Sequence, residues 1–161
     1  MTAENKDQSF KNIFKKFNYG VYLLGSAHNG SYDLITCTWA MQGSYENEEL
    51  IVNIGKERPI SSLIRESRLF SLSILAVENV EEATVCAKSS EKREKALKTL
   101  QFETTEDNLP FLQNSLAYLK CEVTDIFELE SSLLVVGNPI GGKVLSDGVS
   151  LTLHEYYKLS G

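Results

Sequence analysis

Residues 34–62, LITCTWAMQGSYENEELIVNIGKERPISS, decide the fold that we predict for the whole chain. The stretch begins as an alternating strand and passes through a polar turn. It returns as a second strand that leads into a helix start rich in Lys, Arg and Ser. The first strand offers an extended polar edge, and the helix start offers a place for an anion. A flat ligand that carries a phosphate would fit across both.

Side chains alternate between two faces from residue 35 to residue 44. The apolar face, which we expect to point into the core, consists of Ile35, Cys37, Trp39 and Met41. The opposite face is small and polar, as expected where a ring system lies against backbone amides, and consists of Thr36, Thr38, Ala40, Gln42 and Ser44. The same polar face is also typical of an antiparallel strand with one side in solvent. The sequence leaves both interpretations open.

A second strand, residues 49–54, runs directly into a predicted helix that begins at Pro59. A helix N-terminus presents unpaired N–H groups and the positive end of the helix dipole, and both favour phosphate. Lys56 and Arg58 would add charge to this anion site, and Ser61 and Ser62 would add hydroxyl donors. An ordinary surface helix with two solvated cations gives the same local pattern, so this interpretation also stays open.

The composition excludes several classes of function. The chain has 161 residues, of which 16 are basic and 22 acidic, and its net charge of −6 argues against general binding to nucleic acid or anionic membranes. No apolar run approaches the roughly 20 residues that span a bilayer, and residues 1–17 contain no apolar segment typical of a secretory signal. The cysteines Cys37, Cys86 and Cys121 are far apart, so we expect reduced thiols and a cytoplasmic protein. Only two histidines occur, and no CxxC pair, so we expect no metal site.

The remaining segments predict a mainly β chain with few helices. The apolar stripe of Phe10, Ile13, Phe14 and Phe17 predicts an amphipathic helix at about residues 8–17 that covers one end of the core. Strands are expected at residues 20–26, 68–76, 115–125 and 126–136, helices near 77–87 and 91–100, and a turn at the glycine-rich residues 137–142. Strands without regular β–α–β alternation favour an antiparallel β-barrel with inserted helices, of Greek-key type. We expect one domain over residues 1–161.

Catalytic motifs built on side chains are absent from the sequence. The GxSxG, P-loop, HExxH and kinase signatures do not occur. Cys37 is the thiol that a nucleophilic mechanism with His28 or His154 would use, but its place on the apolar face is typical of a packed, inert thiol. If the chain is an enzyme, we therefore expect a cofactor to supply the chemistry, and we assign no catalytic residue.

Two parts of the sequence resemble the flavin reductase-like, FMN-binding split-barrel family. The first is TCTWAMQGSY at residues 36–45 together with ELIVNIGKERPISSLIRESRLFSLSIL at residues 49–75. The second is the ending VLSDGVSLTLHEYYKLSG at residues 144–161. The similarity spans most of residues 10–159 and lies in the order and spacing of these segments. It implies a homodimer of split β-barrels with one FMN per subunit near the dimer interface.

The resemblance also implies which residues contact FMN. The isoalloxazine ring and the ribityl chain would lie against Thr36, Thr38, Trp39, Ala40 and Gln42, partly through backbone atoms, with Ser44 at the far end. The phosphate would be held by Gly55, Lys56, Arg58, Ser61 and Ser62. Ser89 and Ser90 match a loop that reaches the flavin region, and Tyr156 and Tyr157 would close the site, from this subunit or from the other.

The function that the resemblance implies is an FMN-dependent oxidoreductase. NADH or NADPH would deliver hydride to flavin N5, and the electrons would pass to free flavin, a metal or a redox protein. Two departures from the family pattern concern the nicotinamide side, because Ser131 stands where many members have His, and Leu153 stands where they have Tyr. Two alternatives therefore stay open. One is an FMN-containing electron-transfer module reduced by a protein partner such as a rubredoxin, and the other is a non-catalytic split-barrel dimer.

Overall fold

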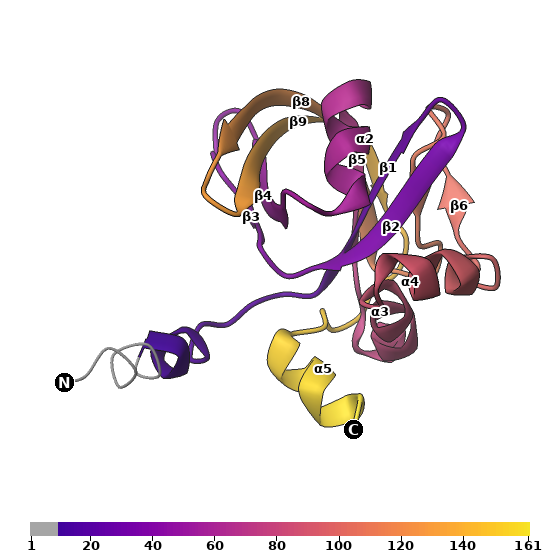
Figure 1. Ribbon diagram of the computed structural model, residues 1–161. Helices are drawn as coiled ribbons and strands as arrows, with labels where there is room; N and C mark the ends of the chain where they lie inside the picture. The colour runs from indigo at the N-terminus through magenta and orange to yellow at the C-terminus, as the bar shows by residue number, and fades with distance from the viewer. Residues whose placement is uncertain (1–9) are drawn as a thin grey trace.

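The computed structural model describes residues 10–161, and its main feature is one sheet of seven strands in the order β2-β1-β5-β8-β9-β4-β3 (Figure 1). The strands are β1 (Tyr22–His28), β2 (Ser31–Cys37), β3 (Ala40–Gln42), β4 (Leu50–Gly55), β5 (Leu69–Ile74), β8 (Ala117–Glu128) and β9 (Ser132–Val144). All neighbouring pairs in this sheet are antiparallel. The mainly β, antiparallel fold predicted from the sequence is confirmed.

The sheet curls because of one short connection. β2 and β3 follow each other in the chain but lie at opposite edges of the sheet. Only Thr38 and Trp39 separate the end of β2 at Cys37 from the start of β3 at Ala40. Three extended steps of chain span about 10 Å at most, so the two edges come close and the sheet forms an almost closed barrel. The split in this barrel lies at Thr38 and Trp39.

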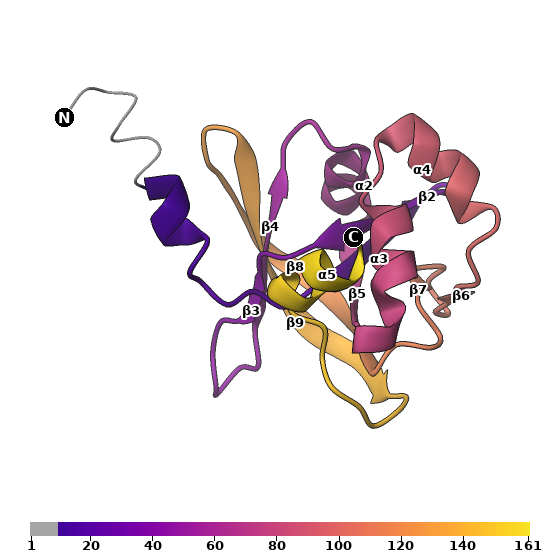
Figure 2. The ribbon, with the colours of Figure 1, turned by 90° about the horizontal axis from the view of Figure 1, so that it is seen from below.

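The helices that follow β4 are α2 (Pro59–Ser67), the short 3₁₀ helix η1 (Val77–Asn79), α3 (Val80–Cys86), α4 (Ser90–Leu97) and α5 (Leu153–Leu159). α2 packs on β1 and β2 and reaches the end of β8 through Arg65 and Glu128, whereas α3 and α4 lie together beside β2 (Figures 1 and 2). A separate two-stranded ribbon of β6 (Glu103–Thr104) and β7 (Pro110–Phe111) follows α4. Within residues 10–161, no helix is long and apolar enough to cross a membrane.

Two apolar cores meet at β1. Leu24 belongs to the core inside the barrel, with Ile35, Val52 and Phe70. Leu23, its neighbour, belongs to a second core beneath α3, α4 and the segment before α5. Successive strand residues point to opposite faces, so β1 is buried on both sides, and both leucines are fully buried. The end of β2 and the split are therefore anchored to a rigid layer.

The prediction of one continuous strand over residues 35–44 is wrong at its centre. Trp39 and Met41 were expected on the core face, but 57% of Trp39 and 62% of Met41 is exposed. The chain leaves β2 at Cys37 and enters β3 at Ala40 on the opposite sheet edge, so the alternation does not continue across the connection. Ile35 and Cys37, which precede the break, do point into the core.

The prediction of a turn at residues 137–142 is also wrong, because these residues lie inside β9. The glycines in this segment allow close packing against neighbouring residues and an irregular register between β8 and β9. A Cβ at Gly137 would lie 2.6 Å from the Phe70 ring, and Gly142 has φ +156° beside the Tyr118 carbonyl. The β8–β9 register shifts between Lys120 and Cys121, opposite this segment. The actual hairpin turn is at residues 129–131.

The N-terminal helix occurs but does not cover the core of its own chain. Residues 10–14 are helical, and the rest of the predicted start, residues 8 and 9, lies outside the described residues. The helix projects from the body of the molecule (Figures 1 and 2). Its apolar side chains are all more than half exposed, and they are Phe10, Ile13, Phe14 and Phe17. The prediction of a helix packed on the barrel is therefore wrong for this chain alone.

Candidate functional site

A small pocket of about 180 Å³ opens at the split of the barrel. One wall is the end of β2 and the connection to β3, and the other is the end of β4 and the turn before α2. The lining residues are Ile35, Thr36, Cys37, Thr38, Trp39, Asn53, Ile54, Gly55 and Arg58. The fold thus joins the two halves of the segment 34–62 in one pocket, which we call the split pocket.

The predicted ring-side residues do not all reach this pocket. Thr36, Thr38 and Trp39 line it, whereas Gln42 and Ser44 lie beyond it on exposed chain, where the Gln42 amide donates to the Ser44 carbonyl at 2.9 Å. The Thr36 hydroxyl donates to the Ala83 carbonyl of α3 at 2.6 Å. Thr36 therefore offers a ligand its backbone rather than its hydroxyl.

The predicted anion site lies at the start of α2. Arg58 is the N-cap residue with extended backbone, Pro59 follows at the first helical position, and no side chain caps the helix. The Ser61 hydroxyl donates to the Gly55 carbonyl at 2.8 Å and so fixes the turn between β4 and α2. Ser62 is exposed. The uncapped helix start thus leaves room for an external acceptor.

The two cations of this segment have different electrostatic surroundings. The Lys56 ammonium lies 3.5 Å from Glu128, which also accepts from Arg65 of α2 at 2.5 Å. The hydrogen bond from Arg65, and then Lys56, hold the pKa of Glu128 below its usual value. Within the described chain, Arg58 forms no ion pair and no side-chain hydrogen bond. Arg58 is therefore the cation that is available to an anionic ligand.

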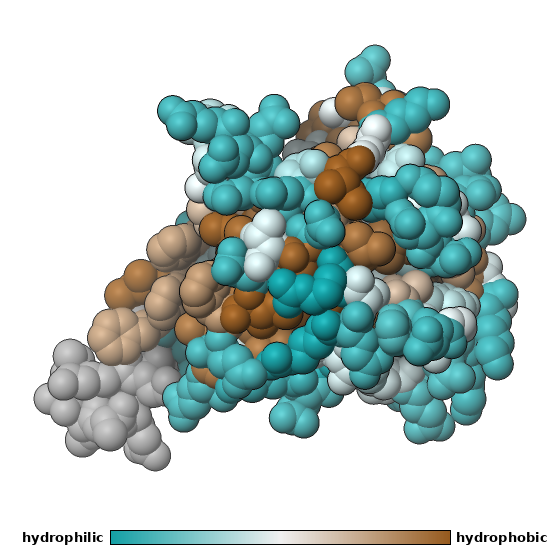
Figure 3. Space-filling model, turned by 90° about the horizontal axis from the view of Figure 1, so that it is seen from above, coloured by the Kyte–Doolittle hydropathy of each residue, from teal (hydrophilic) through white to brown (hydrophobic). Residues whose placement is uncertain are grey.

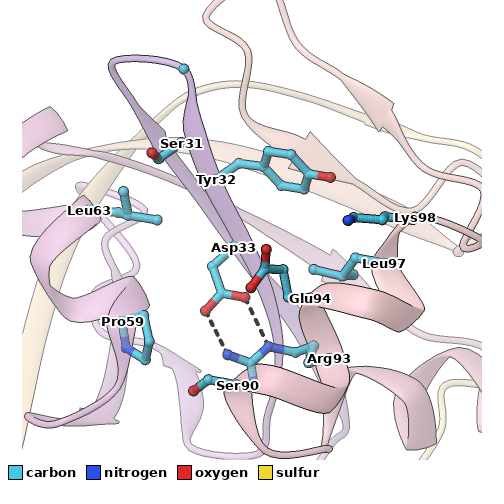
Figure 4. Close-up of a pocket in the computed structure, with 11 residues that line it drawn as sticks. Ser31, Tyr32, Asp33, Pro59, Leu63, Ser90, Arg93, Glu94, Leu97 and Lys98 are labelled. Carbon is cyan, nitrogen blue, oxygen red and sulfur yellow. Dashed lines mark hydrogen bonds and ion pairs between the residues drawn. The ribbon is translucent and has the colours of Figure 1, made fainter.

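A second pocket, about 450 Å³ in volume, lies between α2 and α4 (Figure 4). Pro59 at the start of α2 and Ser90 at the start of α4 both line it. Ser89 is the N-cap residue of α4 and, like Arg58, makes no side-chain cap. The two helices thus begin on either side of one hollow, but neither Ser89 nor Ser90 lines the split pocket of its own chain, and their predicted contact with the flavin region stays a prediction.

A buried ion pair holds α4 in this position. The Arg93 guanidinium donates to both oxygens of Asp33, at 2.9 Å from Nε and 2.7 Å from Nη2 (Figure 4). Its Nη1 donates to the Lys88 carbonyl at 2.7 Å, and Arg93 is only 1% exposed. Asp33 belongs to β2, so the pair ties α4 to the strand that ends at the split pocket. This pair could not be predicted from the sequence, because Arg93 lies in a run of charged residues typical of a solvated helix.

The aromatic pair near the C-terminus lies on α5, whose start has a capping box between Thr152 and Glu155. The Tyr156 hydroxyl lies 3.1 Å from the hydroxyl of Thr84 on α3, and Tyr157 is exposed. Neither tyrosine lines the split pocket of its own chain. Their predicted role in closing the site stays a prediction.

Cys37 lines the pocket but is not a nucleophile. Burial raises the pKa of its thiol to about 11, so the thiol is protonated at neutral pH. Cys86 and Cys121 are buried too, and burial raises the pKa of each to about 12. These values support the interpretation of Cys37 as a packed, inert thiol.

The comparisons with known proteins agree with this fold. The model of the flavin reductase like domain matches residues 14–159. The ferric-chelate reductase (NAD(P)H) of Archaeoglobus fulgidus is 24% identical over 147 residues, which are 89% of this chain and 86% of that protein. A flavin reductase domain protein from Arthrobacter sp. FB24 has a similar structure, with a TM-score of 0.84 at 20% identity over 92% of this chain and 91% of that one.

Other relatives are much longer than this chain. Diflavin flavoprotein A 1 of Synechocystis sp. is 24% identical over 153 residues, which are 92% of this chain but 26% of that protein. The chain therefore spans about a quarter of the length of the diflavin flavoproteins that it matches. The similarity covers one region of those proteins.

Proposed function

The chain belongs to the flavin reductase-like domain family, and on that basis we propose that it binds FMN in the split pocket and acts as an NAD(P)H-dependent flavin oxidoreductase. One observation carries the choice of FMN. The fold joins the exposed connection at Thr38 and Trp39 to an uncapped helix start, where the Arg58 guanidinium has no partner among residues 10–161. A flat ring on one side and a phosphate on the other satisfy both features.

The residues present fit such a ligand. Trp39 and the backbone of residues 36–39 offer a surface for the ring, and Arg58 with the amides of α2 offers donors for the phosphate. Bound FMN would supply the redox chemistry, by accepting hydride from the nicotinamide at N5 and passing electrons onward. The side chains would bind the ring, orient it and keep water away from one of its faces, and none acts as an acid or base.

The nicotinamide is proposed as the electron donor because the relative from Archaeoglobus fulgidus is a ferric-chelate reductase of the NAD(P)H type. We expect NADH or NADPH to bleach the flavin absorbance of the FMN-loaded protein under anaerobic conditions. The measurement is a stopped-flow or static titration with each nucleotide, with dithionite as the control that shows a reducible flavin.

A second candidate is supported by the length of the diflavin relatives, in which the region like this chain is part of a larger flavoprotein. In that case the chain is an FMN module that a protein partner such as a rubredoxin reduces. FMN that dithionite bleaches and neither nucleotide bleaches would favour this candidate. If the purified protein does not bind FMN, the remaining hypothesis is the non-catalytic split-barrel dimer.

We also propose that the active form is a homodimer. Apolar side chains are exposed on the N-terminal helix and around the split, including Phe14, Phe17, Trp39 and Met41. Figure 3 shows the N-terminal segment as a tan and brown strip that leads away from the body. Monomeric soluble proteins rarely expose apolar surface of this extent. A second copy of the chain would cover it and bring further residues to the flavin site.

The variant Phe14→Glu/Phe17→Glu is expected to shift the protein from dimer to monomer. Charge in an apolar interface stays unpaired, and the two rings that lie 5.8 Å apart are removed. Light scattering after gel filtration should give twice 18.0 kDa for the parent and 18.0 kDa for the variant. Lys15→Glu/Lys16→Glu, on the same turn, is the matched control and should stay dimeric. A monomeric parent would contradict the proposal.

A further inference from the structure

Asn53, on β4, has a buried polar atom whose hydrogen-bonding capacity is not met within the described residues. Its side-chain oxygen Oδ1 is buried and has no hydrogen-bond partner, and it is the one such side-chain atom among residues 10–161. Buried polar atoms in folded proteins nearly always have a partner, and an exception calls for a specific explanation. In Asn53 the explanation must lie near the split pocket, because this residue lines it.

Among residues 10–161, no group forms a hydrogen bond with the side-chain oxygen of Asn53. Val52 and Ile54, its neighbours on β4, are buried in the barrel core, so the side chain of Asn53 lies on the opposite face. The backbone N–H of Asn53 donates to the Trp39 carbonyl at 2.9 Å. The backbone of Asn53 is therefore hydrogen-bonded to the connection at the split, whereas its side-chain oxygen has no partner within residues 10–161.

The position of Asn53 points to one part of a flavin. Its backbone bonds to Trp39 on the ring side, and it precedes Gly55 on the phosphate side by two residues, or about 6–7 Å of strand. The segment of FMN between ring and phosphate is the ribityl chain, whose hydroxyl groups are donors. The terminal torsion of Asn is broad, so rotation about it can turn the amide oxygen toward the pocket that this residue lines.

We propose that Asn53 is a specificity residue that recognises the ribityl chain by accepting a hydrogen bond from one of its hydroxyl groups. The inference rests on the proposed flavin binding and adds a residue that the sequence analysis did not select. The unsatisfied amide oxygen lowers the stability of the ligand-free protein, and a hydrogen bond from a bound polyol would offset that loss. Loss of the amide should therefore weaken binding of the ligand and raise the stability of the ligand-free protein, and the two effects can be measured independently.

The test compares three ligands in the parent and in Asn53→Leu, a variant with the same branching at Cγ and without the amide. Binding is followed by quenching of flavin fluorescence, and stability by the Tm of the ligand-free protein. FMN and riboflavin, which share the ribityl chain, should each bind about fivefold more weakly. Lumiflavin, which lacks it, should bind unchanged. The Tm should rise by roughly 2–4 °C because the unsatisfied atom is gone.

The controls separate this inference from the proposed function. Asn138→Leu, at an exposed position of β9, should change neither binding nor Tm by a measurable amount. Asn53→Ala repeats the comparison without the bulk of leucine. A parent protein that binds none of the three flavins contradicts the proposed function itself. A parent that binds them, with all three weakened equally or a lower Tm in both variants, shows a structural role for Asn53 and overturns the inference.

Discussion

Arg58→Ala is expected to raise the dissociation constant for FMN roughly 10- to 100-fold and to leave that for riboflavin unchanged. Hydrogen bonds that involve a charged group contribute about 1.5–3 kcal/mol, and a guanidinium is suited to bind phosphate through paired N–H donors. Arg58 lines the split pocket and has no internal acceptor within residues 10–161. Its loss removes a contact with the ligand without breaking one in the protein.

Fluorescence quenching with the two flavins at low and moderate salt measures this effect. Arg65→Ala is the matched control, because Arg65 is also on α2 but pairs with Glu128. Lys56→Ala should weaken FMN binding less than Arg58→Ala does, since the Lys56 ammonium already lies 3.5 Å from the same carboxylate. Equal weakening of FMN and riboflavin by Arg58→Ala would mean that the phosphate binds elsewhere.

Arg93→Ala is expected to lower the free energy of unfolding by about 3–5 kcal/mol, the usual cost of leaving one buried charge without its partner. Asp33 is 7% exposed and would lose both bonds from the guanidinium. For a chain of this length the Tm should fall by roughly 10 °C. Calorimetry or urea unfolding followed by circular dichroism gives the value.

Two further variants show whether the buried pair is the cause. Lys95→Ala, which breaks the exposed Lys95–Glu91 pair on the same helix, should cost less than about 0.5 kcal/mol. Asp33→Leu/Arg93→Met removes both charges and should recover most of the lost stability. If the double variant is as unstable as Arg93→Ala, packing of the long side chain and not the charge pair holds α4.

The local elements could largely be predicted from the sequence, because each follows from the spacing of neighbouring side chains. Pro59 and the apolar residues after it marked the start of α2. Alternation predicted the end of β2 and the whole of β5, and short β-rich runs predicted β1 and β4. Errors arose where a distant segment decides the local structure. The glycine at position 137 does not mark a turn: it lies in β9, where the Phe70 ring leaves no room for a side chain.

The features of the candidate site likewise fall into those evident from the sequence and those set by distant residues. The cations and hydroxyls of residues 55–62 and the polar connection at Thr38 were evident from residue type and order. That Arg58 is free while Lys56 faces Glu128 was not, because Glu128 is more than 70 residues away in the chain. The orphan oxygen of Asn53 was equally hidden, since an Asn in a strand gives no sign of whether its amide finds a partner.

The sequence by itself determined a mainly β chain, a helix start at Pro59 with Lys, Arg and Ser residues around it, and a polar strand end, since these depend on periodicity, capping and charge within a few residues. Only the tertiary structure decided that β2 and β3 lie at opposite sheet edges, so that two residues must bridge the split. That closure joins the two halves of residues 34–62 in one pocket and exposes Trp39. Within residues 10–161 it leaves the Arg58 guanidinium and the Asn53 side-chain oxygen without a partner. The physical reason is that strand order and register are set by the burial of the whole sheet and not by any one strand.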